Sequence, residues 1–366
     1  MTSKRWFNGK RWFNGLLGLM VVLALLAGCA APAAAPADSG AAPEQEAAVE
    51  ATEAPAEEAV AEATEAPAEE AAAETGEKPY IPMISKGFQH QFWQAVKAGA
   101  EQAAADLNVE ITFEGPESEA MVDKQIEMLQ AALAKNPDAI CLAALDSQAV
   151  IPLLEEAQAA GIPVVGFDSG VDSDIPVSTA ATDNVAAAAL AADKMAELIG
   201  GEGKIAVIVH DQTSRTGIDR RDGFVNRIES EYPNIEIVDV QYGGGDHLKS
   251  TDLAKAIIQA NPDLKGFFGA NEGSAIGVLN AVTELGKEGQ IVVIGYDSGK
   301  QQMDAVRSGV MAGAITQNPI GIGYKCVEAA LKAINGEEVP KVIDTGFFWY
   351  DASNIDSAEI APLLYE

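Results

Sequence analysis

The part of the chain after residue 80 contains an internal repeat. Three pairs of segments carry it: NPDAICLAALDS (136–147) with NPDLKGFFGANE (261–272), NVEI (108–111) with NIEI (234–237), and GFDSG (166–170) with GYDSG (295–299). The partners occur in the same order and at nearly constant offset. We therefore expect two copies of one topology.

Within each copy, short apolar runs alternate with segments of helical period. In the first copy the run YIPMIS (80–85) precedes a helical pattern from Gln89 to Leu107, and in the second the run KIAVIVH (204–210) leads another such series. This alternation predicts βαβ units, and so a parallel sheet in each copy. The expected fold class is α/β, with two doubly wound parallel-sheet lobes.

The N-terminus has the pattern of an export signal. Two KRWFNG units (4–15) supply basic residues ahead of the apolar run at 16–27. That run extends about 18 Å as a helix, which is short for a hydrocarbon core of about 30 Å but suits a signal peptide. The ending Leu-Ala-Gly-Cys resembles a bacterial lipobox, so we expect residues 1–28 to be removed and Cys29 to carry lipid. The alternative is an ordinary signal peptide, cut in the alanine-rich stretch after Cys29.

Residues 29–78 are predicted to be the acylated cysteine and a tether. The segment is almost entirely Ala, Glu, Pro and Thr, and EATEAPAEEAVA (50–61) is followed directly by EATEAPAEEAAA (62–73). Such a sequence has too little apolar surface to offset its ordering entropy, and its charges repel one another. We interpret it as a spacer between the membrane and a folded region.

Charge and cysteine content exclude other classes of protein. The net charge of −31 argues against binding to nucleic acid or to an anionic membrane surface. The three cysteines have no spacing that would clip a metal, and no cofactor or metal is expected. Cys141 falls in an expected strand and Cys326 on a helix face, so both are interpreted as small buried side chains. Their spacing leaves open whether they pair.

In open α/β sheets, ligands bind beyond the carboxyl ends of the strands, so two hinged lobes place both sets of strand ends around one cleft. Most side chains at these ends are carboxylates, amides and aromatics, which suit a polyhydroxylated ligand. The candidate ligand-binding residues are His90, Phe92, Trp93, Asp168, His210, Arg215, Arg220, Asn271, Asp297 and Gln317.

Seven motifs at these positions resemble the periplasmic sugar-binding proteins of ABC importers, of the ribose/galactose type that shares its fold with the lactose-repressor core. The resemblance covers residues 79–346, and its motifs are HQFW (90–93), IPVVGFDSG (162–170), ATDN (181–184), RRDGF (220–224), FFGANE (267–272), VIGYDSG (293–299) and ITQNP (315–319). It implies the type I periplasmic binding protein fold, whose lobes are joined by a multi-strand hinge. The lobes it implies are 79–182 plus 318–345, and 183–317 plus 346–366.

The resemblance also implies roles for individual residues. Phe92 and Trp93 match the residues that stack on the sugar, and Asp168 and Asp297 match the carboxylates that accept hydroxyl protons. Asn271 matches the amide that both donates and accepts, while Gln317 matches a polar contact at the last crossover between the lobes.

Three positions depart from the ribose pattern, because Ala143, Ser169 and Ile218 replace one asparagine and two arginines. Arg215 and Arg220 are nearby substitutes, and His210 is a further candidate. An aldohexose such as glucose is therefore favoured over ribose.

Each of these residues also has a purely structural interpretation. Asp168 and Asp297 could instead satisfy backbone N–H groups of their own Asp-Ser-Gly turns. Trp93 could be a core residue, and Arg220 a structural salt-bridge partner.

The expected function is that of a monomeric, lipid-anchored, extracytoplasmic protein that binds a monosaccharide and delivers it to a membrane-embedded ABC permease. The alternative is a sugar sensor that docks a chemoreceptor or sensor kinase. A repressor would need a basic helix-turn-helix where this chain has an export signal. An enzyme is not expected, because no phosphate-binding loop or G-x-G-x-x-G motif follows a strand.

Overall fold

The computed structural model describes residues 77–365. The predicted signal peptide, the lipid-bearing Cys29 and the tether lie outside the described residues, except for the last two residues of the tether. Among the helices described, none is long and apolar enough to cross a membrane.

The first lobe is built on a six-stranded parallel sheet with the order β11-β5-β4-β3-β1-β2. Its strands are β1 (Tyr80–Ile84), β2 (Glu110–Glu114), β3 (Ile140–Leu142), β4 (Val164–Phe167), β5 (Ser178–Ala181) and β11 (Val342–Asp344). Its helices are α1 (Gln91–Leu107), α2 (Val122–Leu133), α3 (Ile151–Ala159) and α9 (Pro319–Ile334).

The second lobe has a six-stranded sheet with the order β12-β10-β9-β8-β6-β7. Its strands are β6 (Gly203–Val209), β7 (Ile235–Tyr242), β8 (Leu264–Gly269), β9 (Val292–Tyr296), β10 (Gly313–Gln317) and β12 (Phe347–Tyr350). Its helices are α4 (Asn184–Ile199), α5 (Arg215–Glu231), α6 (His247–Ala260), α7 (Glu272–Glu284) and α8 (Lys300–Ser308), with a short 3₁₀ helix at Ala361–Leu363.

The two sheets repeat one topology, as the paired sequence segments predicted. In each lobe the first five strands are ordered 2-1-3-4-5. The sixth strands differ, because β11 runs parallel to β5 whereas β12 runs antiparallel to β10. The expected class of two doubly wound α/β lobes is confirmed, with this one antiparallel edge strand as a departure from a fully parallel sheet.

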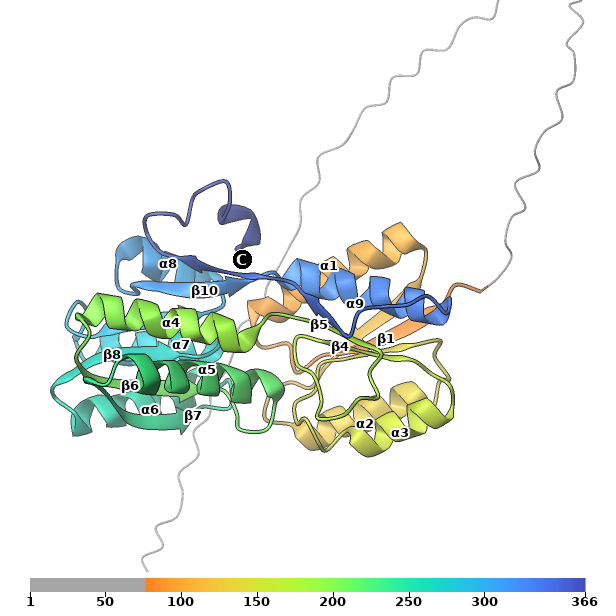
Figure 1. Cartoon of the computed structure of the whole chain (residues 1–366), viewed down its shortest axis with the longest axis horizontal. Coiled ribbons are helices and arrows are strands. Elements are labelled where there is room, and N and C mark those ends of the chain that lie inside the picture. The colour runs from red at the N-terminus through yellow and green to blue at the C-terminus, as the bar shows by residue number, and fades with distance from the viewer. Residues whose placement is uncertain (1–76, 366) are drawn as a thin grey trace, which may run out of the picture. The chain divides into compact units, whose positions relative to one another are not determined.

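The chain crosses between the lobes three times: from β5 to α4, from β10 to α9, and from β11 to β12 (Figure 1). The crossover helix α9 returns to the first lobe and packs closely on α1. A side chain at Gly99 would overlap the carbonyl oxygen of Ile320, and one at Gly323 would overlap that of Val96. These glycines therefore permit the backbones of the two helices to touch.

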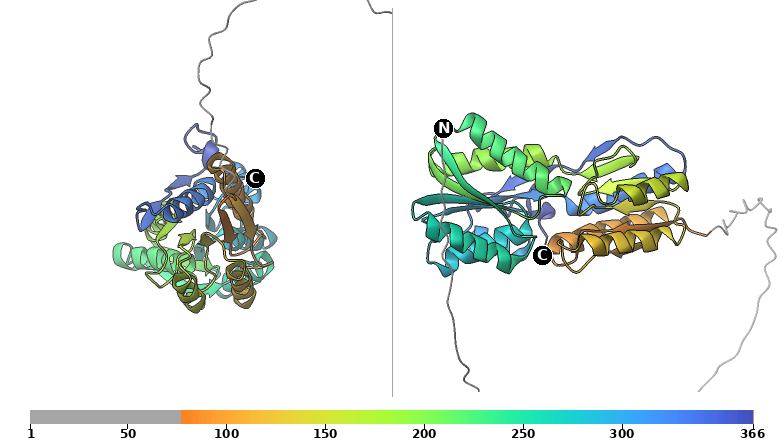
Figure 2. Two further views of the ribbon diagram at one scale, coloured as in Figure 1. Left: turned by 90° about the vertical axis from the view of Figure 1, so that its right-hand side faces the viewer. Right: turned by 90° about the horizontal axis from the view of Figure 1, so that it is seen from below.

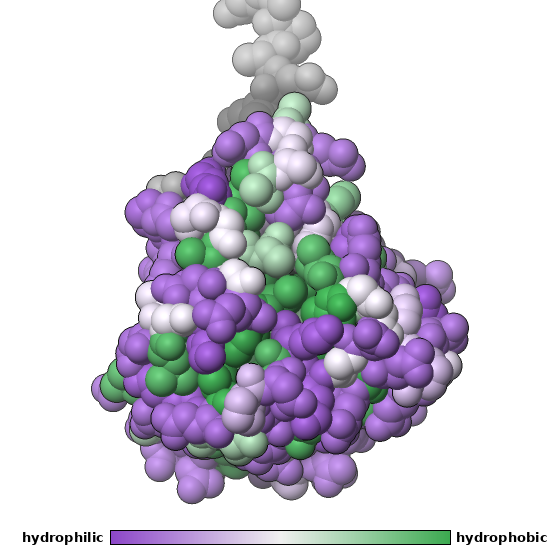
Figure 3. Space-filling model, turned by 90° about the vertical axis from the view of Figure 1, so that its left-hand side faces the viewer, coloured by the Kyte–Doolittle hydropathy of each residue, from purple (hydrophilic) through white to green (hydrophobic). Residues whose placement is uncertain are grey.

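Helices cover both faces of each sheet, as the two further views show (Figure 2). Strand residues are consequently buried on both sides, which explains why they read as nearly continuous apolar runs. In β1, Met83 packs in the cluster with Trp93, whereas Ile84 packs in the cluster with Leu129 on the opposite face. On the outside, the end of the second lobe that lies at the left of Figure 1 is mainly hydrophilic, with hydrophobic residues gathered between the polar ones (Figure 3).

Cys141 in β3 and Cys326 in α9 form a disulfide. Both side chains are fully buried, as the sequence indicated. The bond joins the crossover helix to the sheet of the first lobe, so it fixes an element that reaches this lobe only after the chain has traversed the second. Sequence spacing had left the pairing open.

Candidate functional site

The strand ends of the two lobes face each other across a cleft lined by residues from both. Each lining side chain belongs to a residue that is at most 5% exposed. The lining residues are Lys86, His90, Phe92, Trp93, Glu119, Asp168, His210, Arg220, Asn271, Asp297 and Gln317. The cleft thus brings together nine of the ten predicted ligand-binding residues.

Arg215 is the exception. Its guanidinium pairs with Asp172 and Asp219 at the surface, and its side chain is 37% exposed. Arg215 and Arg220 are five positions apart on α5, which at about 3.6 residues per turn rotates them some 140° from each other. Both cannot face the cleft, and the structure turns Arg220 inward.

Asp168 and Asp297 occupy equivalent positions, each following a strand and each in the left-handed region at φ 55° and 77°. The N–H of Asp168 donates to the carbonyl of Ala180, and that of Asp297 donates to the carbonyl of Ile315. These bonds hold each aspartate against the neighbouring strand. The repeat in the sequence is therefore reproduced as a local symmetry of the cleft.

The carboxylates of these aspartates bond outside their own turns. Asp297 accepts from the Gln317 side-chain amide at 2.6 Å and from the Glu272 backbone N–H at 2.9 Å. Asp168 lies 3.9 Å from the Lys86 ammonium. The contacts of the two side chains therefore favour a place in the cleft over the alternative of local turn capping.

The ionised side chains that line the cleft form three cation–carboxylate pairs. One is Lys86 with Asp168, the second is Arg220 with Asp297 at 4.0 Å, and the third is His90 with Glu119 at 3.3 Å. Because every cation has a carboxylate, this set of side chains carries no net charge. Buried charges without partners would be far more costly.

The His90–Glu119 pair stays ionised despite its burial. Burial by itself lowers the pKa of His90, but attraction to Glu119 and a hydrogen bond with it prevail and raise that pKa to about 9. Burial favours neutral Glu119, yet the charges of His90 and Lys86 hold its pKa well below the usual range. Both groups are thus charged at neutral pH.

Two other cleft residues are shifted toward their neutral forms. Burial raises the pKa of Asp168 to about 6, against the opposing effect of Lys86 and Arg220. Burial and the nearby charge of Lys86 lower the pKa of His210, so its imidazole is neutral and can hydrogen-bond a hydroxyl group.

Arg220 has the structural role that was its alternative interpretation, and it also lines the cleft. Its Nε donates to the Asn184 side chain at 2.7 Å, its Nη1 donates to the Ala270 carbonyl at 3.0 Å, and its guanidinium stacks 3.8 Å from the centre of the Tyr296 ring. These contacts fix the cation that faces Asp297.

Trp93 likewise is a core residue that also lines the cleft. It is 1% exposed and packs in the first-lobe core with its ring nearly perpendicular to that of Phe167. Its indole N–H donates to Glu119 at 2.8 Å. Phe92 packs perpendicular to Trp93 and also meets the ring of Tyr365, the last residue described.

Sequence reasoning missed Lys86 and Glu119. Lys86 comes directly after the first predicted strand, so its position was a usable signal. Glu119 lies in the loop between the second strand and the next helix, where acidic residues are common and give no distinct pattern.

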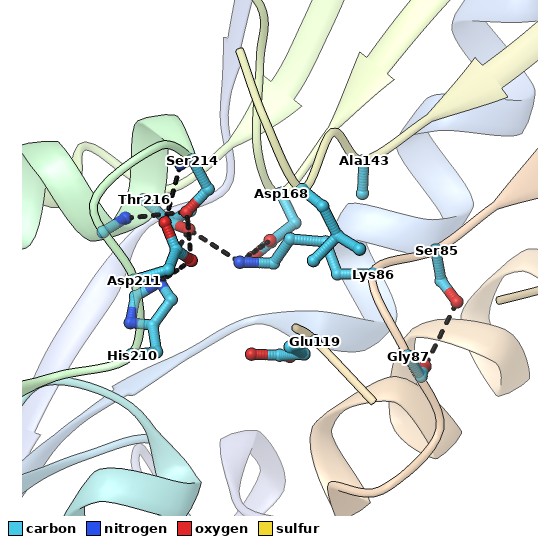
Figure 4. A network of polar contacts seen from close by, with 12 residues as sticks. Ser85, Lys86, Gly87, Glu119, Ala143, Asp168, His210, Asp211, Ser214 and Thr216 are labelled. Carbon is cyan, nitrogen blue, oxygen red and sulfur yellow. Dashed lines mark hydrogen bonds and ion pairs between the residues drawn. The ribbon is translucent and has the colours of Figure 1, made fainter. Parts of the chain in front are cut away.

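Several hydrogen bonds cross from one lobe to the other. The Lys86 ammonium donates to Thr216 Oγ1 at 2.9 Å, as Figure 4 shows. The backbone N–H groups of Gln91 and Phe92, at the start of α1, donate to the carboxylate of Glu272. The lobes are therefore in contact around the cleft. In the described part of the chain, no cluster of three or more His, Cys, Asp or Glu side chains could hold a metal ion.

Comparison with known proteins finds relatives that are sugar-binding proteins. The chain is 29% identical over 249 residues to the D-allose-binding periplasmic protein of Escherichia coli, covering 66% of this chain and 80% of that protein. It is 26% identical over 252 residues to the ribose import binding protein of Bacillus subtilis, covering 69% of this chain and 80% of that protein.

Solved structures that are similar to this chain are also sugar-binding proteins of transporters. An ABC transporter solute binding protein from Agrobacterium vitis with bound D-fucose has a TM-score of 0.76 and 36% identity, covering 78% of this chain and all of that one. A carbohydrate transporter solute binding protein from Agrobacterium radiobacter, in complex with D-arabinose, has a TM-score of 0.76 and 32% identity. The match covers 78% of this chain and 99% of that one. The model of the periplasmic binding protein domain matches residues 81–338, and the chain belongs to that family.

Proposed function

We propose that this protein is an extracytoplasmic, lipid-anchored substrate-binding protein that acts as a monomer and delivers a monosaccharide to an ABC permease. The observation that carries the proposal is the cleft itself. Two symmetric aspartates, an amide pair and two aromatic rings meet there among balanced charges, which suits an uncharged polyol. The lobes that close on it are proposed to be 79–182 plus 318–345, and 183–317 plus 346–366.

The proposed mechanism is a population shift. Sugar contacts with Asp168 come from the first lobe and contacts with Asp297, Asn271 and Gln317 come from the second, so the full set is made only when the lobes are closed. A ligand that binds the closed form better shifts the protein toward it. The permease would then recognise the closed form.

The proposed ligand class is an aldohexose, with glucose as the leading candidate. Support comes from the departures at Ala143, Ser169 and Ile218, and from hexose-binding relatives. These include the D-allose-binding protein and a glucose-galactose binding protein from Geobacillus stearothermophilus, whose structure is 26% identical with a TM-score of 0.74.

A thermal-shift screen of the full chain in mild detergent tests this function. The panel holds pentoses, aldohexoses, ketohexoses, inositols, amino acids and nucleotides, each at saturating concentration. Stabilisation grows with ligand excess and reaches about 4 kcal/mol at a thousand times Kd. A shift confined to one or two monosaccharides is expected. If no sugar shifts the melting temperature and an amino acid or nucleotide does, the proposed function is refuted.

The lipid anchor is supported by the cysteine inventory. The sequence has three cysteines, and Cys141 and Cys326 are joined to each other, so Cys29 alone is left for acylation. Cys29→Ala should move the protein from the membrane fraction to the soluble fraction when cells are broken. An unchanged membrane pool would contradict the anchor.

A further inference from the structure

Glu119 has a buried oxygen with no partner in the described structure. The residue is 5% exposed. Its Oε1 accepts from the indole N–H of Trp93 at 2.8 Å and lies 3.3 Å from Nδ1 of His90, whereas its Oε2 has no hydrogen-bond partner. An unsatisfied carboxylate oxygen in such a place is costly and calls for an explanation.

Asp297, another carboxylate of the cleft, has no such unpaired oxygen. Both oxygens of Asp297 already accept hydrogen bonds, one from Gln317 and one from Glu272. Glu119 therefore differs from this aspartate, because both of its bonds fall on one oxygen and the other oxygen has no partner. Figure 4 shows its carboxylate turned toward His210.

The opposite lobe lies close to this oxygen without giving it a hydrogen bond. Gly245, at φ 68°, lies in the loop after β7, and a Cβ built there would stand 2.9 Å from Oε2 of Glu119. A side chain at that position would collide with the buried oxygen, so glycine is required for this close approach. The His90 Nε2 also lies 2.9 Å from the Gly245 carbonyl, so this loop is held against the first lobe.

The charge state decides what the oxygen can bind. His90 and Lys86 keep Glu119 ionised, and an ionised carboxylate can only accept hydrogen bonds. Its partner must be a donor, such as a hydroxyl group. The three balanced cation–carboxylate pairs leave no surplus positive charge for a carboxylate or phosphate on the ligand.

We propose that Glu119 is a third ligand-binding carboxylate, which accepts a hydrogen bond from one hydroxyl of the sugar and restricts the ligand to uncharged monosaccharides that carry this hydroxyl. The inference rests on the proposed sugar-binding function and deepens it. It assigns a specificity-determining contact to a loop of the first lobe outside every motif used to recognise the site.

The alternative is that Glu119 only positions Trp93 and His90. Isothermal titration with the full chain in mild detergent separates the two roles. The ligands are the sugar found in the screen and its complete set of monodeoxy analogues, and the protein is compared with its Glu119→Gln variant. Glu117→Gln is the matched control, because this exposed glutamate lies in the same loop two residues away.

In the unaltered protein, one deoxy analogue should bind about 10- to 100-fold more weakly than the parent sugar, as expected for loss of a hydrogen bond to a charged group. Glu119→Gln should bind the parent sugar about as weakly as the unaltered protein binds that deoxy analogue. The variant should bind the deoxy analogue less than about threefold more weakly than it binds the parent sugar. Glu117→Gln should behave as the unaltered protein does. The uronic acid of the same sugar should not bind.

A uniform loss of affinity for every analogue, with the deoxy pattern unchanged, would show a positioning role and overturn the proposal. If Glu119→Gln does not fold, Glu119→Asp keeps the charge beside His90 but withdraws the oxygens, and the same selective loss is expected. Failure of every sugar to bind the unaltered protein would instead refute the proposed function, so the two failures are distinguishable.

Discussion

The Cys141–Cys326 disulfide should contribute several kcal/mol to stability. The cysteines are 185 residues apart in sequence, so the bond closes a very long loop in the unfolded chain. The chain-entropy relation gives about 5 kcal/mol for a loop of that length, as an upper value. With an unfolding entropy of about 2.1 cal/mol/K per residue, a folded region of this size should lose about 8 °C in Tm when the bond is absent.

Calorimetry of the oxidised chain against the same chain reduced in denaturant and refolded in reductant measures this directly, since both forms keep the two sulfur atoms. The Cys141→Ala/Cys326→Ala variant should melt near the reduced form. Alkylation in denaturant without reductant, followed by mass spectrometry, checks the pairing. Modification of both cysteines would refute the bond, and a Tm difference below about 2 °C would refute the loop-entropy argument.

Three further predictions concern the cleft and the lobe packing. Asp168→Ala or Asp297→Ala should weaken sugar binding by about 2 to 4 kcal/mol, because each removes a buried charge-assisted acceptor, and titration showing less than a threefold change for both would exclude them from the site. Because Glu119 raises the pKa of His90 to about 9, the folded state retains a proton that the unfolded chain loses near pH 6.5. The free energy of unfolding should therefore fall by up to about 3 kcal/mol between pH 6.5 and 9, and urea titrations with no such slope would contradict the pair. Gly99→Ala should separate α1 from the crossover helix and cost about 1 to 3 kcal/mol, whereas an unchanged melting temperature would contradict their close approach.

The two-lobed topology could be predicted from the sequence because its signals are local. Strand and helix periods are set by neighbouring residues, and the paired segments at 136–147 and 261–272 show that one order of elements is used twice. Since parallel strands end at one edge of a sheet, the positions of Asp168 and Asp297 after equivalent strands were enough to predict that both face the cleft.

The partners of individual side chains were decided by tertiary structure. The disulfide depends on a crossover helix that returns from the second lobe, so no local sequence pattern predicts it. Arg215 and Arg220 are equally basic in sequence, and only the orientation of α5 turns one inward. Glu119 lies in an unremarkable acidic loop, and it acquires significance because folding buries it beside His90 with one oxygen unpaired. Local sequence thus determined the elements and their ends, whereas contacts between distant residues required the packed fold.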